Sequence, residues 1–549
     1  MRYKIGTKAN QLMQVLCLTG EYPADKLDLF LCSVPNFKKT ITEMKKDSLI
    51  DKVTLQPHNS KYRLHKKNRK LEEYLEDFGL TDEYEAIVYY RLTLTRAKAL
   101  RLSKQSLIMA MAIANEIPIT HKQPFAIGSY GYYTLKELRK KEEEEEHKTD
   151  NSARYTTALG VLNTHNCGYV VYATNDELIH WNTYSEVRLR EFVLSLMSTN
   201  DEEKDKIELR EIILVQSLDC VWSILDQEAQ MNYERLKSKR PKLPTHVRID
   251  GTYKHVHVMP MTPDGSRMIG WLNIPNMQQQ FLDSVCLYGN IDKTNNTYGV
   301  DCDALMGRNF ILFFIDGDIA RLSAFYTAAK IDIAYFKYVV YTIPCWVDFL
   351  ENHMPELEVR SLSFDDMKLA LSSKNIESDD ILNFAFEIVK KEADDIVLFE
   401  NYDEIWSLFQ EEKNKNKHFV PKNLKGKQML RWLTIPNVQQ QIIKIAFEGG
   451  IYKVIDKERN TLEVDCDAYA EKTFVLFSID GSIARLKAFY DTARRDSNSE
   501  YIVYTVPFWE DFIKENMSDT LKIFTIPSDG IEIAIETFAK EEKESDQEN

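Results

Sequence analysis

An internal duplication restricts the folds open to this chain. Four pairs of segments match, in the same order along the sequence. They are residues 211–225 with 395–409, 257–280 with 418–441, 300–329 with 464–493, and 338–354 with 501–517. Repeated supersecondary units bury their apolar faces by stacking on neighbours, so we expect a body built from tandem units.

The order of elements within each copy predicts an α/β unit. Short apolar runs alternate with segments of helical periodicity, which gives helix, strand, strand, helix, strand, helix and strand. This order predicts a three-layer unit and fits both a restriction-endonuclease-like and a Rossmann-like core. A third relative precedes the two copies, with a strand pair at 157–176, a helix at 185–196, and a further strand and helix at 211–225.

The charge of the chain is distributed unevenly. The first 70 residues hold 15 Lys and Arg against 6 Asp and Glu, which is a net +9. Because the whole chain carries −15, the remainder carries −24. A basic head on an acidic body indicates a local anion-binding surface.

The basic head reads as helices followed by a β-hairpin. Apolar spacing predicts helices over residues 7–18, 25–31 and 37–50, and a hairpin with strands at 52–55 and 61–64. This is the order of a winged helix, whose third helix enters the major groove while the wing contacts the DNA backbone. We therefore expect a multidomain α/β protein, with an N-terminal winged helix followed by degenerate tandem repeats of one of the two folds above.

Basic and polar side chains on the third helix and the wing predict a site for double-stranded DNA. Lysine and arginine neutralise phosphates and release counterions, which gives affinity for any sequence. The predicted DNA-binding residues are Lys38, Lys39, Thr42, Lys45, Lys46, Asn59, Lys61, Arg63, Lys66, Lys67 and Arg69. The alternative for such a head is a protein-docking surface.

The 549 residues are several times the usual domain size, so we divide the chain into five segments. They are a winged-helix domain at 1–75, a helical connector at 76–135, an α/β unit at 136–256, and the two repeat copies at 257–394 and 395–549. Within the connector, residues 84–119 are predicted to be helical. Their apolar stripe would join the head to the body or form a homodimer.

The sequence favours a cytoplasmic protein that does not contact a membrane. Its N-terminus lacks the apolar run of a secretory signal, and the most apolar stretch, 107–119, is too short to span a bilayer. The eight cysteines form no CxxC pair, which argues against a zinc ribbon or a disulfide framework.

The acids of the two VDCDA segments are the candidates for a metal site, since paired carboxylates near strand ends can hold a divalent cation for phosphodiester cleavage. They are Asp301, Asp303, Asp465 and Asp467. Such a nuclease also needs a nearby basic residue, and the strands FILFFI and FVLFSI have none. Asp316 and Asp480 follow these strands, and the exchange of Asp318 for Ser482 favours helix capping. We therefore assign no metal site.

Other chemistry-bearing residues also receive structural interpretations. His255 and His257 share one face of a predicted strand, but only His257 recurs, as His418, and no third ligand is evident. Cys302 and Cys466 are expected to be small buried side chains. The sequence contains no GxxxxGK[ST], GxGxxG, GxSxG or HExxH pattern. We therefore expect no cofactor, and we favour a protein that is not an enzyme.

Part of the chain resembles a known family. The predicted winged helix, the segment YYTLKELRK and the segment ALGVLNTHNCGYVVYATNDELIHWNTYSEVRLREF are similar to the replication-relaxation-type proteins of Firmicute conjugative elements and plasmids. The resemblance covers roughly residues 5–230. It implies a cytoplasmic bacterial DNA-binding protein of plasmid or integrative-element replication or transfer, with a nuclease-like α/β fold.

These observations lead to one main hypothesis and two alternatives. The main hypothesis is a non-enzymatic DNA-binding accessory protein, in which the head binds duplex DNA and the acidic repeats bind partner proteins. The alternatives are a metal-dependent nuclease of restriction-endonuclease-like fold, and a transcriptional regulator with an α/β sensing body.

Overall fold

The computed structural model describes most of the chain, and all structural statements below refer to these residues. The described residues are 3–56, 59–91, 95–126, 128–144, 156–164, 167–174, 183–197, 208–222, 255–291, 298–331, 335–372, 379–435, 441–444, 453–455 and 464–534. They form two compact units, each described separately. Unit 1 comprises 1–278, 313–331 and 340–361, and unit 2 comprises 279–312, 332–339 and 362–549.

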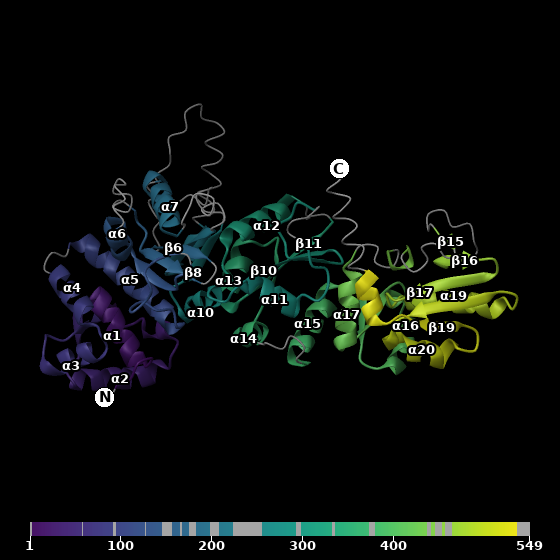
Figure 1. Ribbon diagram of the computed structural model, residues 1–549, viewed down its shortest axis with the longest axis horizontal. Helices are drawn as coiled ribbons and strands as arrows, with labels where there is room; N and C mark the ends of the chain where they lie inside the picture. Colours follow the sequence, from purple (N-terminus) through teal and green to yellow (C-terminus); the bar gives the residue numbers. More distant parts are fainter. Residues whose placement is uncertain are drawn as a thin grey trace, which may run out of the picture. The chain divides into compact units, whose positions relative to one another are not determined.

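The elements of the N-terminal half alternate between helices and strands. They are α1 Lys8–Thr19, β1 Glu21–Pro23, η1 Leu27–Phe30, α2 Val34–Lys46, β2 Ile50–Gln56, β3 Asn59–Leu64, α3 Arg69–Asp77, α4 Thr81–Arg91, α5 Arg96–Ala114, β4 Gly131–Thr134, α6 Leu135–Glu144, β5 Gly160–Asn163, β6 Gly168–Ala173, α7 Thr183–Met197, β7 Leu209–Val215, β8 Val256–Pro260 and α10 Pro263–Leu272. Figure 1 labels most of them along the chain.

The C-terminal half continues this alternation. Its elements are α11 Met277–Val285, β9 Ala304–Met306, β10 Asn309–Phe314, α12 Ile319–Ile331, β11 Lys337–Thr342, α13 Pro344–His353, β12 Glu358–Ser361, α14 Phe364–Ser372, α15 Asp379–Glu392, β13 Ile396–Phe399, η2 Tyr402–Glu404, α16 Ile405–Gln410, η3 Glu412–Asn414, β14 His418–Pro421, α17 Leu424–Leu433, β15 Lys453–Val454, β16 Ala468–Ala470, β17 Thr473–Ser478, α19 Ile483–Arg495, β18 Glu500–Thr505, α20 Pro507–Met517 and β19 Lys522–Thr525. The expectation of a multidomain α/β protein is confirmed at this level.

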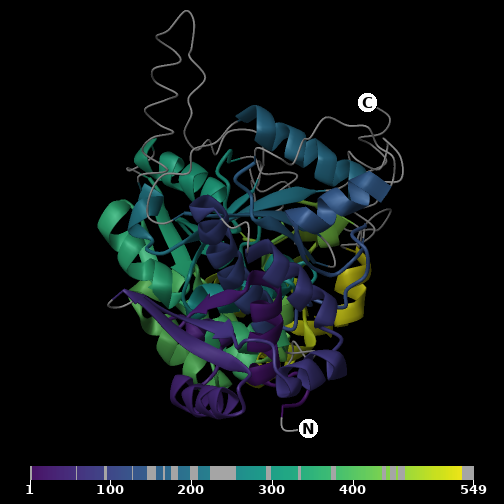
Figure 2. The same ribbon diagram turned by 90° about the vertical axis from the view of Figure 1, so that its left-hand side faces the viewer.

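The head contains the predicted helices and hairpin with shifted boundaries. The third helix, expected over 37–50, is α2 and spans Val34–Lys46, because Pro35 fits the first turn of a helix. It ends at Asp47, and Ile50 already opens β2. The hairpin is joined by β1, which the sequence analysis missed, so the sheet has the order β1-β3-β2. Figure 2 views these purple elements from their own end.

The predicted helix over 84–119 is two helices, α4 and α5. The second, α5, carries the buried apolar residues Leu107, Ile108, Met109 and Met111, whereas Leu100 is exposed. Polar groups of α5 also reach the first α/β sheet: Gln105 donates to the carbonyl of Leu159 at 2.7 Å, and Lys104 to that of Ala173 at 2.9 Å. The helix thus joins the head to the sheet inside unit 1, as expected.

The first sheet has the order β4-β5-β6-β7-β8. Strands β4, β5 and β6 form an antiparallel meander, and β7 and β8 then add in parallel. The elements expected of the third relative are present here, since β5 and β6 are the strand pair, α7 is the helix and β7 is the next strand. The helix predicted within 211–225 lies partly outside the described residues.

The duplicated segments have matching elements. Helices α10, α12 and α13 correspond to α17, α19 and α20, and strands β9 to β12 correspond to β16 to β19. In the second copy the sheet has the order β15-β16-β17-β18-β19, and in the first the order is β12-β11-β10-β9, where the division between units passes through β10 and β11. The hairpin register is also preserved, since Ala304 opposes Ile311 as Ala468 opposes Val475.

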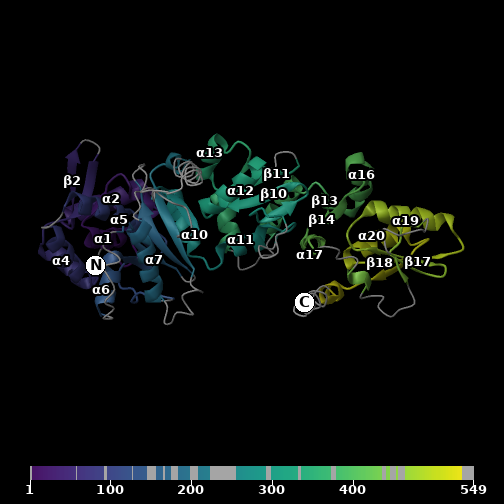
Figure 3. The same ribbon diagram turned by 90° about the horizontal axis from the view of Figure 1, so that it is seen from above.

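The strand that opens each copy pairs with the strand before it in one register. Ile212 lies opposite His257 in the parallel pair β7–β8, and Ile396 lies opposite His418 in β13–β14. The two pairs differ in their surroundings, because β7 and β8 complete the first sheet whereas β13 and β14 form a separate two-stranded sheet. Figure 3 shows β13 and β14 side by side in unit 2.

A glycine joins the opening strand of each copy to the turn after its central strand. The amide of Val258 donates to the carbonyl of Gly317 at 2.8 Å, and the amide of Phe419 donates to that of Gly481 at 2.9 Å. Both glycines have φ near 70°. A Cβ would lie 2.5 Å from the carbonyl oxygen of Val258 at the first and 2.4 Å from that of Phe419 at the second. The IDG segments therefore form the junction within each copy.

Among the described helices, none combines the length and the apolar character needed to cross a bilayer. No disulfide joins any of the eight cysteines, all of which lie in described segments, and Cys302 and Cys466 are buried as expected.

Candidate functional site

The predicted DNA-binding residues of the third helix lie together on one exposed face of α2. Phe37, Ile41 and Met44 point into the core of the head and are at most 3% exposed. Helical spacing therefore turns the polar positions outward. The residues on the outer face are Lys38, Lys39, Thr42, Lys45 and Lys46, all of them exposed.

The four lysines of this face form no ion pair with any residue that the structure describes. Thr42 donates its hydroxyl to the carbonyl of Lys38 at 2.9 Å, back along the same helix. Lys45 and Lys46 occupy the last turn, where a positive charge interacts favourably with the helix dipole. The positive charge of this face is thus available to an external anion.

On the hairpin, by contrast, the predicted DNA-binding residues Lys61 and Arg63 are held by an acid. Both lie on the central strand β3 and pair with Glu21 of β1, with Arg63 Nη2 at 2.8 Å from its carboxylate. Burial alone would raise the pKa of Glu21, but hydrogen bonds from Lys61 and Arg63 and their charges lower it. These two cations are engaged within the sheet and are poorly placed to neutralise phosphates.

The remaining predicted residues follow the hairpin or lie at its tip. Lys66 is exposed, Lys67 lies 3.4 Å from Glu72, and Arg69 pairs with Glu73 at 2.8 Å across one helical turn. Pairs this exposed are weak and leave the cations accessible. Asn59 opens β3, and its side chain lies outside what the structure describes.

The candidate metal acids of the second copy are bound by an arginine. Arg485 of α19 donates to Asp467 through two nitrogens, at 2.7 and 3.1 Å, and to Asp465 at 3.0 Å. Asp467 also accepts the backbone amide of Phe477 at 2.8 Å. A guanidinium fork satisfies paired carboxylates without a cation. In the first copy Asp303 is buried, and Asp301 and Asp303 have interactions of their own.

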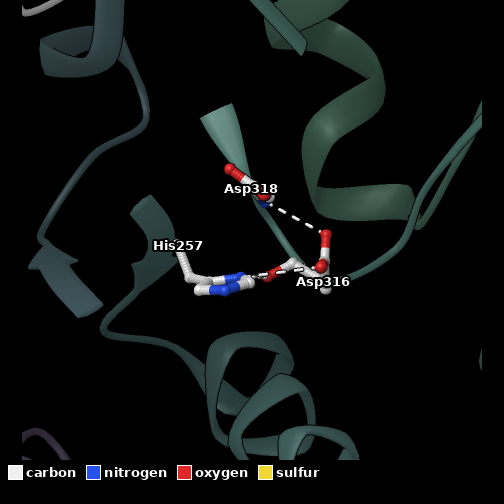
Figure 4. A group of neighbouring side chains, drawn as sticks. All are labelled: His257, Asp316 and Asp318. Carbon is white, nitrogen blue, oxygen red and sulfur yellow. Dashed lines mark hydrogen bonds and ion pairs between the residues drawn. The ribbon is translucent and has the colours of Figure 1, made fainter. Parts of the chain in front are cut away.

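A different cluster, in unit 1, brings histidines and aspartates together where β8 meets the turn before α12. His257 is fully buried, and its Nδ1 lies 3.1 Å from the backbone oxygen of Asp316 and 3.6 Å from its carboxylate. His255 Nδ1 lies 2.6 Å from Asp318, and His255 Nε2 lies 3.2 Å from Glu208. Figure 4 shows His257 on its strand opposite the segment that carries both aspartates.

Asp318 is 1% exposed and is stabilised as an anion. Burial alone would raise its pKa, but the hydrogen bond with His255 and the positive charges of His257, His255 and Arg321 lower the pKa to about 2. Its other oxygen accepts the amide of Ala320 at 3.1 Å, so the expected capping of α12 is observed. Ser482 stands at the N-cap of α19 but forms no side-chain capping hydrogen bond, so the same expectation is wrong for the second copy. The His255–Asp318 contact was not expected from the sequence.

The second copy keeps only half of this cluster. His418 Nδ1 lies 2.8 Å from the backbone oxygen of Asp480 and 3.8 Å from its carboxylate, as in the first copy. Asn416 and Ser482 stand where the first copy has His255 and Asp318. The joint exchange of one charged pair for two neutral residues is the signal that could have revealed the contact from sequence.

Comparisons with known proteins add no assignment. No protein-family model matches the chain, and no curated protein and no solved structure matches it.

Proposed function

We propose that this protein is a non-enzymatic accessory factor that binds double-stranded DNA through the exposed lysine face of α2. The observation that carries the proposal is the group of four exposed lysines on one helix face without acidic partners among the described residues. Such a face can neutralise several phosphates, and the release of their counterions drives binding. Following the family resemblance, we place this activity in plasmid or integrative-element replication or transfer.

The arrangement of the head supports a winged-helix interpretation. The chain order is α1, β1, η1, α2, β2 and β3, and the short first strand pairs with the last strand of the hairpin. In that interpretation α2 is the recognition helix, which would enter the major groove. Thr42, exposed between the lysines, is the neutral polar side chain that could contact a base edge.

The distribution of charge supports a division of labour. The residues after position 70 carry −24, so they repel the DNA backbone and contribute little affinity for it. We propose that the repeats bind protein partners and that the head alone supplies the DNA contacts.

The test is fluorescence anisotropy of the full-length protein on a mixed-sequence duplex at several salt concentrations. We expect the logarithm of the affinity to fall linearly with the logarithm of salt concentration. Lys45→Glu combined with Lys46→Glu should weaken binding at least about tenfold and lower the salt slope by about 2, roughly one per phosphate contact.

The matched control is Lys390→Glu combined with Lys391→Glu, which changes two adjacent exposed lysines in the last turn of α15. This variant has the same net charge as the first, so equal losses from both pairs would show a general charge effect and refute the assignment to α2. Unchanged binding by the Lys45 and Lys46 variant would also refute it.

A further inference from the structure

Three potential metal ligands converge in the first copy, apart from the proposed DNA-binding face. One ligand atom each of His257, Asp316 and Asp318 lies within 4.8 Å of the other two; His257 and Asp318 are buried, and the Asp316 side chain is 12% exposed. The side chains come from β8 and from the turn that precedes α12, two segments fixed to each other by the Val258–Gly317 hydrogen bond. Their approach is therefore set by the backbone.

The side chains of these three residues form no hydrogen bond with one another, although the backbone amide of Asp318 donates to the Asp316 carboxylate at 3.1 Å. The 3.6 Å between His257 Nδ1 and the Asp316 carboxylate is too long for a hydrogen bond. The other ring nitrogen of His257, Nε2, is buried and has no hydrogen-bond partner among the described residues. Asp318 already has His255 at 2.6 Å, whereas the ion-pair contact of Asp316 among the described residues is the one with His257 at 3.6 Å. A cation between the two carboxylates would compensate Asp316, because a charge removed from water costs free energy unless it is paired.

We propose that His257, Asp316 and Asp318 bind a divalent transition-metal ion. One imidazole and two carboxylates form a ligand set that suits Mn²⁺ and Zn²⁺ better than Mg²⁺ or Ca²⁺, which prefer oxygen ligands alone. His257 would bind as neutral imidazole. His255, 2.6 Å from Asp318, would orient that carboxylate from outside the ligand set.

The second copy provides an internal control for this site. It retains His418 and Asp480 in the same geometry but has Ser482 in place of the third ligand and Asn416 in place of the orienting histidine. Two ligands without the third bind a cation weakly, so we expect one metal ion per chain and not two.

The experiment uses the full-length, tag-free protein, freed of metal with a chelator and titrated with Mn²⁺ alone and with Zn²⁺ alone. Mn²⁺ binds thiolates poorly, so it separates this site from the eight cysteines. Bound metal is counted by elemental analysis after desalting, and Mn²⁺ binding is followed by electron paramagnetic resonance. We expect about one equivalent per chain.

Asp318→Ser should weaken binding roughly 100-fold or more, and His255→Asn roughly 10- to 100-fold. Both variants introduce the residues that the second copy already has, so the fold should tolerate them, which circular dichroism checks. Asp316→Asn is a second test of the ligand set, should Asp318→Ser fail to fold. Asp480→Asn, the equivalent change in the second copy, should leave the stoichiometry and affinity unchanged.

Two results would overturn the proposal. One is a wild-type protein that retains neither Mn²⁺ nor Zn²⁺, which would leave the cluster as an internal ion pair. The other is undiminished binding by Asp318→Ser and Asp316→Asn, which would place the metal elsewhere. DNA binding by α2 does not depend on either result.

Discussion

The two copies of the repeat have matching helices and strands but differ in charge at one junction. This is the place where the opening strand of each copy meets the turn that follows its central strand. In each junction a histidine lies beside the backbone carbonyl of an aspartate. The residue after that histidine donates a backbone hydrogen bond to the carbonyl of a glycine. Only the first copy adds the pair of His255 and the buried Asp318. Both junctions therefore need a glycine with positive φ that approaches a backbone carbonyl closely. The second copy forms its junction without the charged pair, so the pair is an addition in the first copy.

The cores of the copies differ in a complementary way. Trp346 and Trp509 are equivalent and buried at 0% and 1% exposure. Trp346 packs edge-on against Phe314, with ring centroids 4.9 Å apart. The second copy has Ser478 at the position of Phe314, and Trp509 instead contacts Phe399 at 5.7 Å. Both tryptophans keep the partner on their own helix, Phe349 and Phe512 respectively, and each has a further aromatic partner from a strand that differs between the copies.

The largest expected effect comes from breaking this exchange of aromatic partners. Phe314→Ser in the first copy should lower the free energy of unfolding by about 4 kcal/mol, because it leaves a cavity beside Trp346. Adding Val215→Phe, which introduces the residue found at Phe399, should recover at least about 1 kcal/mol through a new aromatic contact. Urea denaturation followed by far-ultraviolet circular dichroism measures the free energy of unfolding of both variants. If Val215→Phe recovers no stability in the Phe314→Ser protein, the two positions do not exchange the aromatic partner of the tryptophan.

The glycines of the two junctions should be equally intolerant of change. Gly317→Ala and Gly481→Ala should each cost about 3 kcal/mol, since alanine disfavours positive φ and its Cβ meets a backbone carbonyl. Gly299→Ala is the control, because it also has positive φ but open space around its Cβ. It should lose only the backbone contribution, roughly 1 to 2 kcal/mol. If Gly481→Ala lowers the free energy of unfolding no more than Gly299→Ala does, the two junctions are not equivalent.

Much of the body could be predicted from sequence because repetition supplies its own evidence. The matched segments correspond to matched helices and strands, and even the faint third relative has the expected strand pair and helix. What could not be predicted was which strands share a sheet. The strand at 256–260 lies inside the duplicated segment but completes the preceding sheet, because pairing between distant strands leaves no local pattern.

The candidate sites show the same difference between features that are local in sequence and features that depend on contacts between distant residues. The lysine face of α2 followed from helical periodicity, which is local. The pairing of Lys61 and Arg63 with Glu21 could not be foreseen, since it depends on a strand 40 residues away in sequence that was not recognised. The approach of His257 to Asp316 and Asp318 likewise depends on tertiary contact over about 60 residues.

The smallest expected effect concerns the charged pair that distinguishes the first junction, and it depends on pH. Asp318 has its pKa lowered to about 2 by folding, below its usual 3.8. A depressed acid pKa stabilises the folded state above the unfolded pKa, and this stabilisation disappears as the pH falls from about 4 toward 2. The surroundings of Asp318, in which the hydrogen bond with His255 is the largest stabilising cause and the charges of His257 and Arg321 add to it, should therefore contribute about 2 kcal/mol at pH 7 and progressively less below pH 4. A double-mutant cycle of His255→Asn and Asp318→Ser, measured by urea denaturation in chelator at pH 7 and pH 3.5, isolates the contribution of the pair.

The coupling energy should shrink at the lower pH, whereas Asp480→Asn in the second copy should couple to neither change. A coupling that is equal at both pH values would mean that the pair is held by packing, and that the two junctions differ in shape and not in charge.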